Sequence, residues 1–317
     1  MPHINYYDQP TLRDPVVIVA LGGWNDAADS ATTAIKFLNE LWKPGKIAEI
    51  DSEDFFVFTE TRPTIKFIDG IERMIVWPGN QFLAYTNPDL PHDIILVQGV
   101  EPQLKWQTFS REFIEVCMHF SASEIIFLGA LLADVPHSVA VPITGTSSDE
   151  TVMERMREMD IHSSRYEGPT GMIGVLQDEC RRSGISSASF WAAAPHYLAA
   201  TPNIKVTAAL LTYLNIYLSL NLDLSVIHSD AVHFEEQISA LVERDPEASA
   251  YVRKLEEQVA ERDDEDEDED DEREETQFDS IPGTGPLPSA DSLIRDVEEL
   301  LRKQRENGSQ QQTDEDE

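Results

Sequence analysis

The pattern of apolar positions along the chain predicts buried strands that alternate with amphipathic helices. Residues 16–21 and 94–98 are mostly apolar, β-branched runs, which are typical of strands covered on both faces. A helical pattern with one apolar side follows each run, over residues 27–41 and 106–120. Further strands are predicted over residues 47–51, 55–58, 74–77, 82–85, 125–128 and 188–194, and further helices over residues 151–159, 172–182, 204–220 and 230–262.

This alternation predicts an α/β fold, specifically a three-layer α/β/α sandwich with a mostly parallel sheet and additional C-terminal helices. Gly79 and Asn80 predict one antiparallel hairpin between the segments 74–77 and 82–85. We expect residues 1–262 to form one α/β domain with a C-terminal helical extension. Residues 263–317 are expected to be an acidic disordered tail with a short amphipathic helix over 290–305.

The charge of the chain is strongly negative, with a net value of −35. Residues 263–317 hold 22 acidic and 5 basic residues, so this tail carries about half of the excess charge on far fewer residues. A nucleic-acid surface needs clustered Lys and Arg to neutralise phosphates, and an anionic membrane surface favours the same basic residues. The sequence therefore predicts neither a nucleic-acid partner nor a membrane partner.

The compartment predicted from the sequence is the cytoplasm. The first residues have no basic segment followed by an apolar one, as a secretory signal would. The longest apolar run, residues 204–220, is interrupted by Lys205 and other polar residues, so we interpret it as a buried helix. Cys117 and Cys180 stand alone, which is typical of a reducing compartment.

Standard catalytic and metal-binding motifs are absent from the sequence, so we predict no catalytic residue, no metal and no cofactor. There is no Gly-x-Ser-x-Gly, no His-Glu-x-x-His and no Cys-x-x-Cys. His228 and His233 are close in sequence, but their spacing places them on different sides of a helix. The glycines of residues 168–174 lack the lysine of a phosphate loop; they could present backbone N–H groups to an anion or simply allow close packing.

Polar residues do gather after the predicted strands. Ligands of open parallel sheets bind beyond the carboxyl ends of the strands. The residues expected along this edge, as candidates for binding a small polar ligand, are Asn25, Asp26, Glu101, Asp134, His137, Thr146, Thr170 and His196. The alternative is that they cap helices and satisfy backbone groups of the loops.

Several motifs, in one order, resemble a known family. They include Gly22-Gly-Trp-Asn-Asp26, Gly99-Val-Glu-Pro-Gln-Leu-Lys-Trp106, Arg165-Tyr-Glu-Gly-Pro-Thr-Gly171 and Trp191-Ala-Ala-Ala-Pro-His-Tyr197. Over about residues 10–260 the chain resembles the actinobacterial branch of the proteasome assembly chaperone 2 family. The resemblance implies a sandwich similar to the purine nucleoside phosphorylase-like fold, self-association, and proteasome-related or other protein partners, and it implies no catalytic residues.

Two functions follow from these observations. The first is a non-enzymatic, homo-oligomeric protein-interaction or assembly factor. The alternative is a protein or enzyme that binds a nucleoside- or phosphate-containing small molecule at the strand ends. For the oligomer, the aromatic residues that could form an interface, or else belong to the core, are Phe55, Phe56, Phe58, Trp77 and Phe82.

Overall fold

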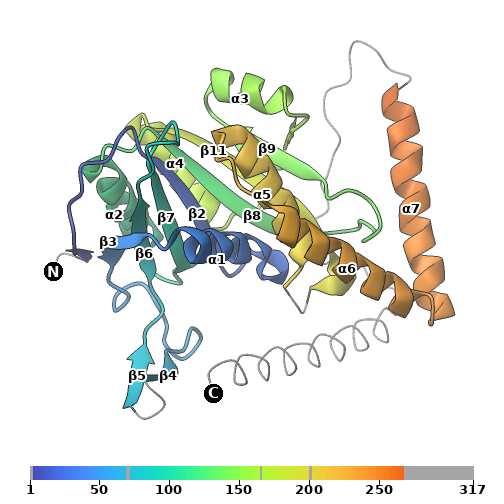
Figure 1. Cartoon of the computed structure of the whole chain (residues 1–317), viewed down its shortest axis with the longest axis horizontal. Coiled ribbons are helices and arrows are strands. Elements are labelled where there is room, and N and C mark those ends of the chain that lie inside the picture. Colours follow the sequence, from blue (N-terminus) through green and yellow to red (C-terminus); the bar gives the residue numbers. More distant parts are fainter. Residues whose placement is uncertain (1–2, 69–71, 165, 200–201, 268–317) are drawn as a thin grey trace.

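A computed structural model describes residues 3–68, 72–164, 166–199 and 202–267 of the chain, with side chains up to residue 261 (Figure 1). Within this part, nine strands form one sheet in the order β1-β3-β6-β7-β2-β8-β11-β9-β10. In chain order these strands are β1 (Ile4–Tyr6), β2 (Val16–Gly22), β3 (Gly45–Ile50), β6 (Asn80–Tyr85), β7 (Ile94–Val100), β8 (Glu124–Ala133), β9 (Ile143–Ser147), β10 (His162–Ser163) and β11 (Ser186–Pro195).

The centre of the sheet is parallel. Strand β2 pairs in parallel with β7 on one side and with β8 on the other, and β8 pairs in parallel with β11. Antiparallel strands lie outside this group, with β6 beside β7 and β9 beside β11. The strongest apolar runs in the sequence therefore form the central strands, which have a neighbouring strand at each edge and packed side chains on both faces.

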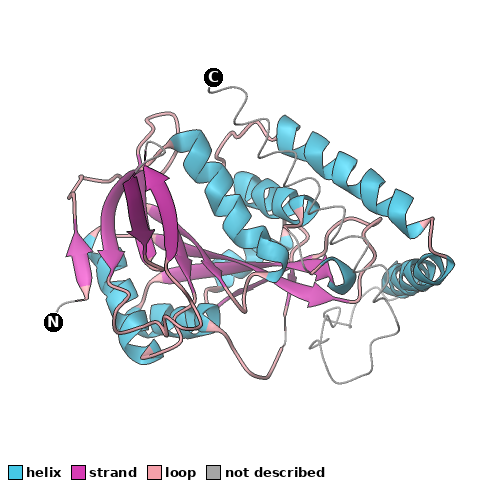
Figure 2. Cartoon of the chain, turned by 90° about the horizontal axis from the view of Figure 1, so that it is seen from below, coloured by secondary structure: helices cyan, strands magenta, loops and turns pink. Residues whose placement is uncertain are grey.

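Helices cover both faces of the sheet (Figures 1 and 2). Ile18 and its alternate neighbours pack on one side with α1 (Ser30–Trp42), α3 (Glu150–Arg157) and α5 (Ile204–Leu218). Val19 and its alternate neighbours pack on the other side with α2 (Trp106–His119) and α4 (Met172–Ser183). The predicted three-layer α/β/α sandwich is confirmed, because the period-2 alternation of a strand sends successive apolar residues to opposite faces.

Two further helices, α6 (Ser225–Val242) and α7 (Pro246–Glu267), lie beyond the end of β11 (Figure 1). The prediction of one helix over 230–262 was wrong. Asp245 breaks it, because its Oδ1 accepts the backbone N–H of Glu247 at 2.9 Å, and Pro246 then suits the first position of a new helix. Helix α7 also continues past the expected boundary at residue 262; the proposed helix over 290–305 lies outside the described residues.

Two strand predictions were also wrong. Residues 55–58 lie in a turn, where Phe55 is fully buried and packs edge to face on Phe109 of α2, with ring centroids 5.4 Å apart. The hairpin does not form at Gly79, since β6 pairs with β3 and β7. Instead, β5 (Glu72–Val76) pairs with an unpredicted strand, β4 (Thr64–Ile68), in a separate two-stranded sheet.

The apolar segment 204–220 is the buried helix that the sequence predicts. Eight residues of α5 are buried, including Leu210, Leu211 and Leu214, and the helix packs on α1 and β11. Among the described residues, every helix is too short or too polar to cross a lipid bilayer.

Candidate functional site

The carboxyl ends of β2 and β7 meet at Glu101. Its Oε1 accepts the side-chain N–H of Asn25 at 2.8 Å and the backbone N–H of Met172 at 2.6 Å. Met172 is the first residue of α4, so a carboxylate lies at the N-terminus of that helix, where the helix dipole favours negative charge. The N-terminus of α4, where the sequence allowed an external anion to bind, is therefore occupied by the chain's own Glu101.

Asn25 is held in this cluster from both sides. Its side-chain amide donates to Glu101, and its backbone carbonyl accepts the N–H of Ala130 of β8 at 2.9 Å. A Cβ at Gly171 would lie 2.2 Å from Asn25 Oδ1, so only glycine allows α4 to begin this close to the end of β2. The neighbouring Thr170 is exposed, and its hydroxyl donates to the carbonyl of Gly171 at 3.3 Å.

Asp26 caps α1. Its carboxylate accepts the backbone N–H of Ala31 at 2.7 Å and both the backbone N–H and the hydroxyl of Thr32. Burial raises the pKa of this carboxyl above its usual value, and the bonds from Thr32 and Ala31 oppose that rise. Asp26 therefore satisfies the orphan N–H groups at the start of a helix.

A second polar cluster lies at the ends of β8 and β11, around Tyr197. The rings of His137 and His196 both meet the Tyr197 ring edge to face, at centroid distances of 6.0 and 5.5 Å. His196 Nδ1 lies 3.2 Å from an Asp134 carboxylate oxygen, and its Nε2 lies 3.3 Å from the Tyr251 hydroxyl of α7. The structure therefore brings together three of the predicted residues, Asp134, His137 and His196.

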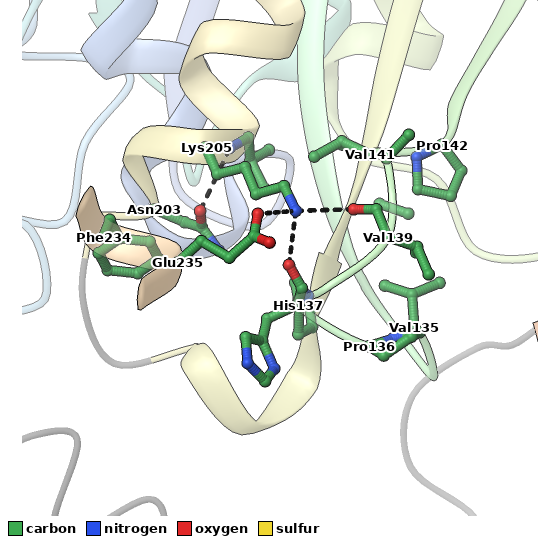
Figure 3. Close-up of a pocket in the computed structure, with 14 residues that line it drawn as sticks. Val135, Pro136, His137, Val139, Val141, Pro142, Asn203, Lys205, Phe234 and Glu235 are labelled. Atoms are coloured by element: carbon green, nitrogen blue, oxygen red, sulfur yellow. Dashed lines mark hydrogen bonds and ion pairs between the residues drawn. The ribbon is translucent and has the colours of Figure 1, made fainter. Parts of the chain in front are cut away.

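Lys205, in the first turn of α5, joins this cluster to α6 (Figure 3). Its ammonium donates to the carbonyls of His137 at 2.6 Å and Val139 at 2.7 Å, and pairs with Glu235 at 2.5 Å. The cavity beside these residues has a volume of only about 10 Å³, which is roughly the space of one water molecule. The contacts thus fasten the segment after β8 to two helices and leave no room for a nucleoside or a similar ligand.

Both ring nitrogens of His137 have hydrogen-bond partners. The Tyr197 oxygen accepts the backbone N–H of His137 at 2.8 Å and also lies 2.8 Å from Nδ1 of the ring. Nε2 lies 3.1 Å from the Ser239 hydroxyl. Burial, followed by the positive charge of Lys205, lowers the pKa of His137 below 6.5.

This neutral histidine predicts acid sensitivity. The folded state holds a proton on His137 less readily than the unfolded state, so stability is complete above the unfolded pKa of 6.5 and is lost as the pH falls towards the lower folded value. We expect the free energy of unfolding to drop more in the wild type than in His137→Gln between pH ~7.5 and ~5.5. Urea denaturation at both pH values measures the difference, with His162→Gln at an exposed position as the control. Equal drops in the wild type and His137→Gln would contradict this assignment.

Thr146 lies away from both clusters. It is part of β9, which runs antiparallel to β11, so its end points to the other edge of the sheet. The Thr146 hydroxyl is 2.8 Å from the hydroxyl of Ser189, its register partner in β11. The expectation that residues 144–147 form a loop on the common edge was incorrect, because direction in the sheet decides at which edge a strand ends.

Another surface was not predicted from the sequence. The β4–β5 hairpin, residues 64–68 and 72–76, projects from the sandwich at the bottom of Figure 1 and carries large apolar side chains in contact with solvent. Ile65 and Phe67 are each 60% exposed and Ile75 is 55% exposed. Ile65 is paired with Ile75 and Phe67 with Arg73, so all four side chains share one face of the ribbon. The signal available in the sequence was the alternation Ile65-Lys66-Phe67.

The sequence also left unassigned the residues that hold the second cluster together. Tyr197, Lys205 and Ser239 supply most of its contacts. A single lysine in the apolar run 204–220 was the available signal, since a charge in a buried helix requires partners. In the part of the chain described here, no group of three or more His, Cys, Asp or Glu residues is placed to hold a metal ion.

These features define an α/β/α sandwich protein whose strand-end polar residues bind its own backbone and helices, and whose apolar hairpin projects into solvent. The chain belongs to the PAC2 family, which it matches over residues 20–242. No protein of curated function shows significant similarity to it.

Solved structures agree with this assignment. A PAC2 family protein from Streptomyces avermitilis is 37% identical, with a TM-score of 0.69, over 75% of this chain and 100% of that one. A proteasome-assembly chaperone homologue from Mycobacterium tuberculosis is also 37% identical, with a TM-score of 0.67, over 75% of this chain and 99% of that one. The archaeal proteasome activator PbaB from Pyrococcus furiosus shares the fold at 19% identity, with a TM-score of 0.61, over 75% and 97% of the two chains.

Proposed function

We propose that this protein is a homo-oligomeric, non-enzymatic assembly factor that binds proteasome subunits in the cytoplasm. The observation that carries the proposal is the β4–β5 hairpin, which holds large apolar side chains in solvent on a chain of net charge −35. Exposed apolar clusters of this kind mark protein-interaction surfaces. The similarity to a mycobacterial proteasome-assembly chaperone homologue supports proteasome subunits as the partners.

The strand-end clusters support a structural role over a catalytic one. Glu101 and Asp26 direct their carboxylates to backbone N–H groups at the starts of α4 and α1. His137 is bonded at both ring nitrogens, and the cavity beside it holds about one water molecule. Groups that are fully engaged in holding elements together are poor candidates for binding a substrate.

The test is reconstitution with proteasome subunits from an actinobacterium. We expect the full chain to form a stable complex with free α-subunits and to accelerate the appearance of assembled particles, as followed by native mass spectrometry. A variant with Phe67→Ser and Ile75→Ser should lose both effects, whereas Val226→Ser with Val232→Ser, which removes exposed apolar area on α6, should keep them. No complex and an unchanged assembly rate with the wild-type chain would refute the proposal.

A further inference from the structure

A histidine fastens the first strand of the main sheet. Strand β1 lies at one edge of the sheet, where it pairs with β3. It is three residues long, so its ladder is short, although Ile4 and Tyr6 also pack against the apolar layer that contains α2. His3 precedes β1, and its backbone carbonyl accepts the N–H of Asp51 at 2.6 Å, just beyond the end of β3. The contacts of His3 therefore affect how firmly β1 is held at the edge.

The His3 ring lies between two carboxylates from different parts of the chain. Its Nδ1 is hydrogen-bonded to Glu112 of α2, and its Nε2 lies 2.8 Å from a carboxylate oxygen of Asp54, in the segment after β3. The Phe55 ring packs edge to face on the imidazole, with ring centroids 5.0 Å apart. The side chain thus joins the start of β1 to α2 and to the segment after β3.

This geometry requires a charged imidazole. Ionised carboxylates accept hydrogen bonds and cannot donate them, and a neutral imidazole carries an N–H on one ring nitrogen only. His3 satisfies both partners when it is an imidazolium, which donates from both nitrogens. The hydrogen bond to Glu112 is the largest cause that raises the pKa of His3 above 6.5; burial opposes the rise, and the bond to Asp54 adds to it.

The neighbouring charges keep the Asp54 carboxylate ionised. The Lys105 ammonium lies 2.9 Å from its second oxygen, and the bonds from Lys105 and His3 lower the pKa of Asp54. Within the described residues, the charged groups facing the His3 ring are thus Glu112 from α2 and Asp54 from the segment after β3, with Lys105 behind Asp54. His119 of α2 is a second titratable group beside β1, because its ring lies 4.4 Å from that of Tyr6.

We propose that His3, Asp54 and Glu112 form a pH-dependent clamp that keeps β1 paired with β3. The protonated imidazole bridges both carboxylates and holds the strand in place. When the ring loses its proton, one carboxylate faces a nitrogen lone pair, and β1 opens more often. An open β1 leaves the outer N–H and C=O groups of β3 unpaired, so the clamp controls whether the sheet presents a free edge to which another strand can add. This device is separate from the β4–β5 hairpin that carries the proposed function.

The direction of the pH effect follows from proton linkage. The closed state binds the His3 proton more tightly than the open state, in which a histidine has its ordinary pKa of about 6.5. The stabilisation by the clamp is therefore complete below pH ~6.5 and is lost as the pH rises through the raised pKa of the closed state. The opening equilibrium should increase by about tenfold for each unit that separates the two pKa values.

Two NMR measurements on the full chain test the clamp. A pH titration of the His3 ring signals gives its pKa. Hydrogen exchange of the backbone N–H groups of Tyr7 and Asp51, corrected for the intrinsic rate at each pH, gives the opening equilibrium. These groups donate to the carbonyls of Ile47 and His3, so both report the pairing of β1 with β3. We expect a pKa above 6.5 and an increase in opening between pH ~6 and ~8.5 that matches the measured pKa shift at about tenfold per unit.

Matched variants separate the clamp from its surroundings. Glu112→Gln removes one carboxylate, so it should lower the pKa of His3 and reduce the increase in opening. Glu53→Gln removes an exposed carboxylate from the same segment as Asp54 and should change neither quantity. His3→Gln should open β1 more than the wild type at pH ~6 and show no further increase at higher pH, whereas His119→Gln should behave as the wild type.

The results that would overturn the proposal are equally definite. The first is a His3 pKa at or below 6.5 in the wild type. The second is an increase in opening that is no larger in the wild type than in His3→Gln. An increase that persists in His3→Gln and disappears in His119→Gln would assign the pH dependence to His119 and would also exclude the clamp.

Discussion

Gly99→Ala should destabilise the protein by about 3 kcal/mol, at the upper end of what overpacking a core costs. Gly99 lies in β7, directly beside the fully buried Asn80 of β6. A Cβ at this position would lie 1.7 Å from Asn80 Oδ1 and 3.1 Å from Asn80 Cα. The Asn80 side chain is buried and held in place, because its Nδ2 donates to the carbonyl of Val100 at 3.2 Å. Urea denaturation measures the loss.

The matched control is Gly45→Ala in β3 of the same sheet. A Cβ at Gly45 would meet no atom within 4 Å, so we expect a change within about 0.5 kcal/mol. The double variant Asn80→Ala with Gly99→Ala should be more stable than the sum of the two single losses predicts, because shortening residue 80 removes the main overlap. Strict additivity, or an unaffected Gly99→Ala, would show that the strands can separate at this point.

Glu101→Ala should cost about 3 kcal/mol, because it leaves two buried donors without an acceptor. These donors are the Asn25 side-chain amide and the backbone N–H of Met172, at 2.8 and 2.6 Å from Glu101 Oε1. Asn25 is 1% exposed, so its amide depends on the Glu101 carboxylate as its acceptor. The measurement is the free energy of unfolding in urea.

Glu101→Gln separates the hydrogen bonds from the charge. It keeps an acceptor oxygen at the start of α4 and should lose only about 1 kcal/mol, the part owed to the negative charge at the helix N-terminus. Glu257→Ala, at an exposed position of α7, should change little. If Glu101→Ala were as stable as the wild type, the carboxylate would be free for another role, and the ligand-binding hypothesis for this edge would gain support.

Much of the layer structure was predictable from local pattern. The run 16–21 indicated a strand buried on both faces, and β2 has β7 and β8 as parallel neighbours. The helices predicted at 106–120 and 172–182 cover one face of the sheet as α2 and α4. Periodicity reports which sides of an element are buried, and that information suffices for a helix-covered sheet.

The predicted ends of helices and strands were wrong where two local signals in the sequence competed. Pro246 following Asp245 marks the start of α7, yet the longer periodic pattern suggested one helix. Phe55 is apolar and aromatic like a strand residue, but it fills a space against Phe109 from within a turn. A buried side chain can belong to a turn as well as to a strand, so burial does not by itself define the backbone conformation.

The candidate site depended on pairings that the sequence does not contain. Six of the predicted polar residues lie at the expected edge because parallel strands end together, and His137 meets His196 through Tyr197. Thr146 is elsewhere because β9 runs opposite to β11. Which donors satisfy Glu101, and how little space remains beside Lys205, follow from the order of strands and the docking of α4, α5 and α6.

The sequence by itself determined the alternation of strands and helices, the acidic character of the chain and the family motifs, since each of these is written in neighbouring residues. Only the tertiary structure decided that the strand-end residues bind one another and that the apolar side chains of β4 and β5 are left in solvent. An alternating strand pattern shows that one face needs cover, and only the folded chain shows whether that cover is present.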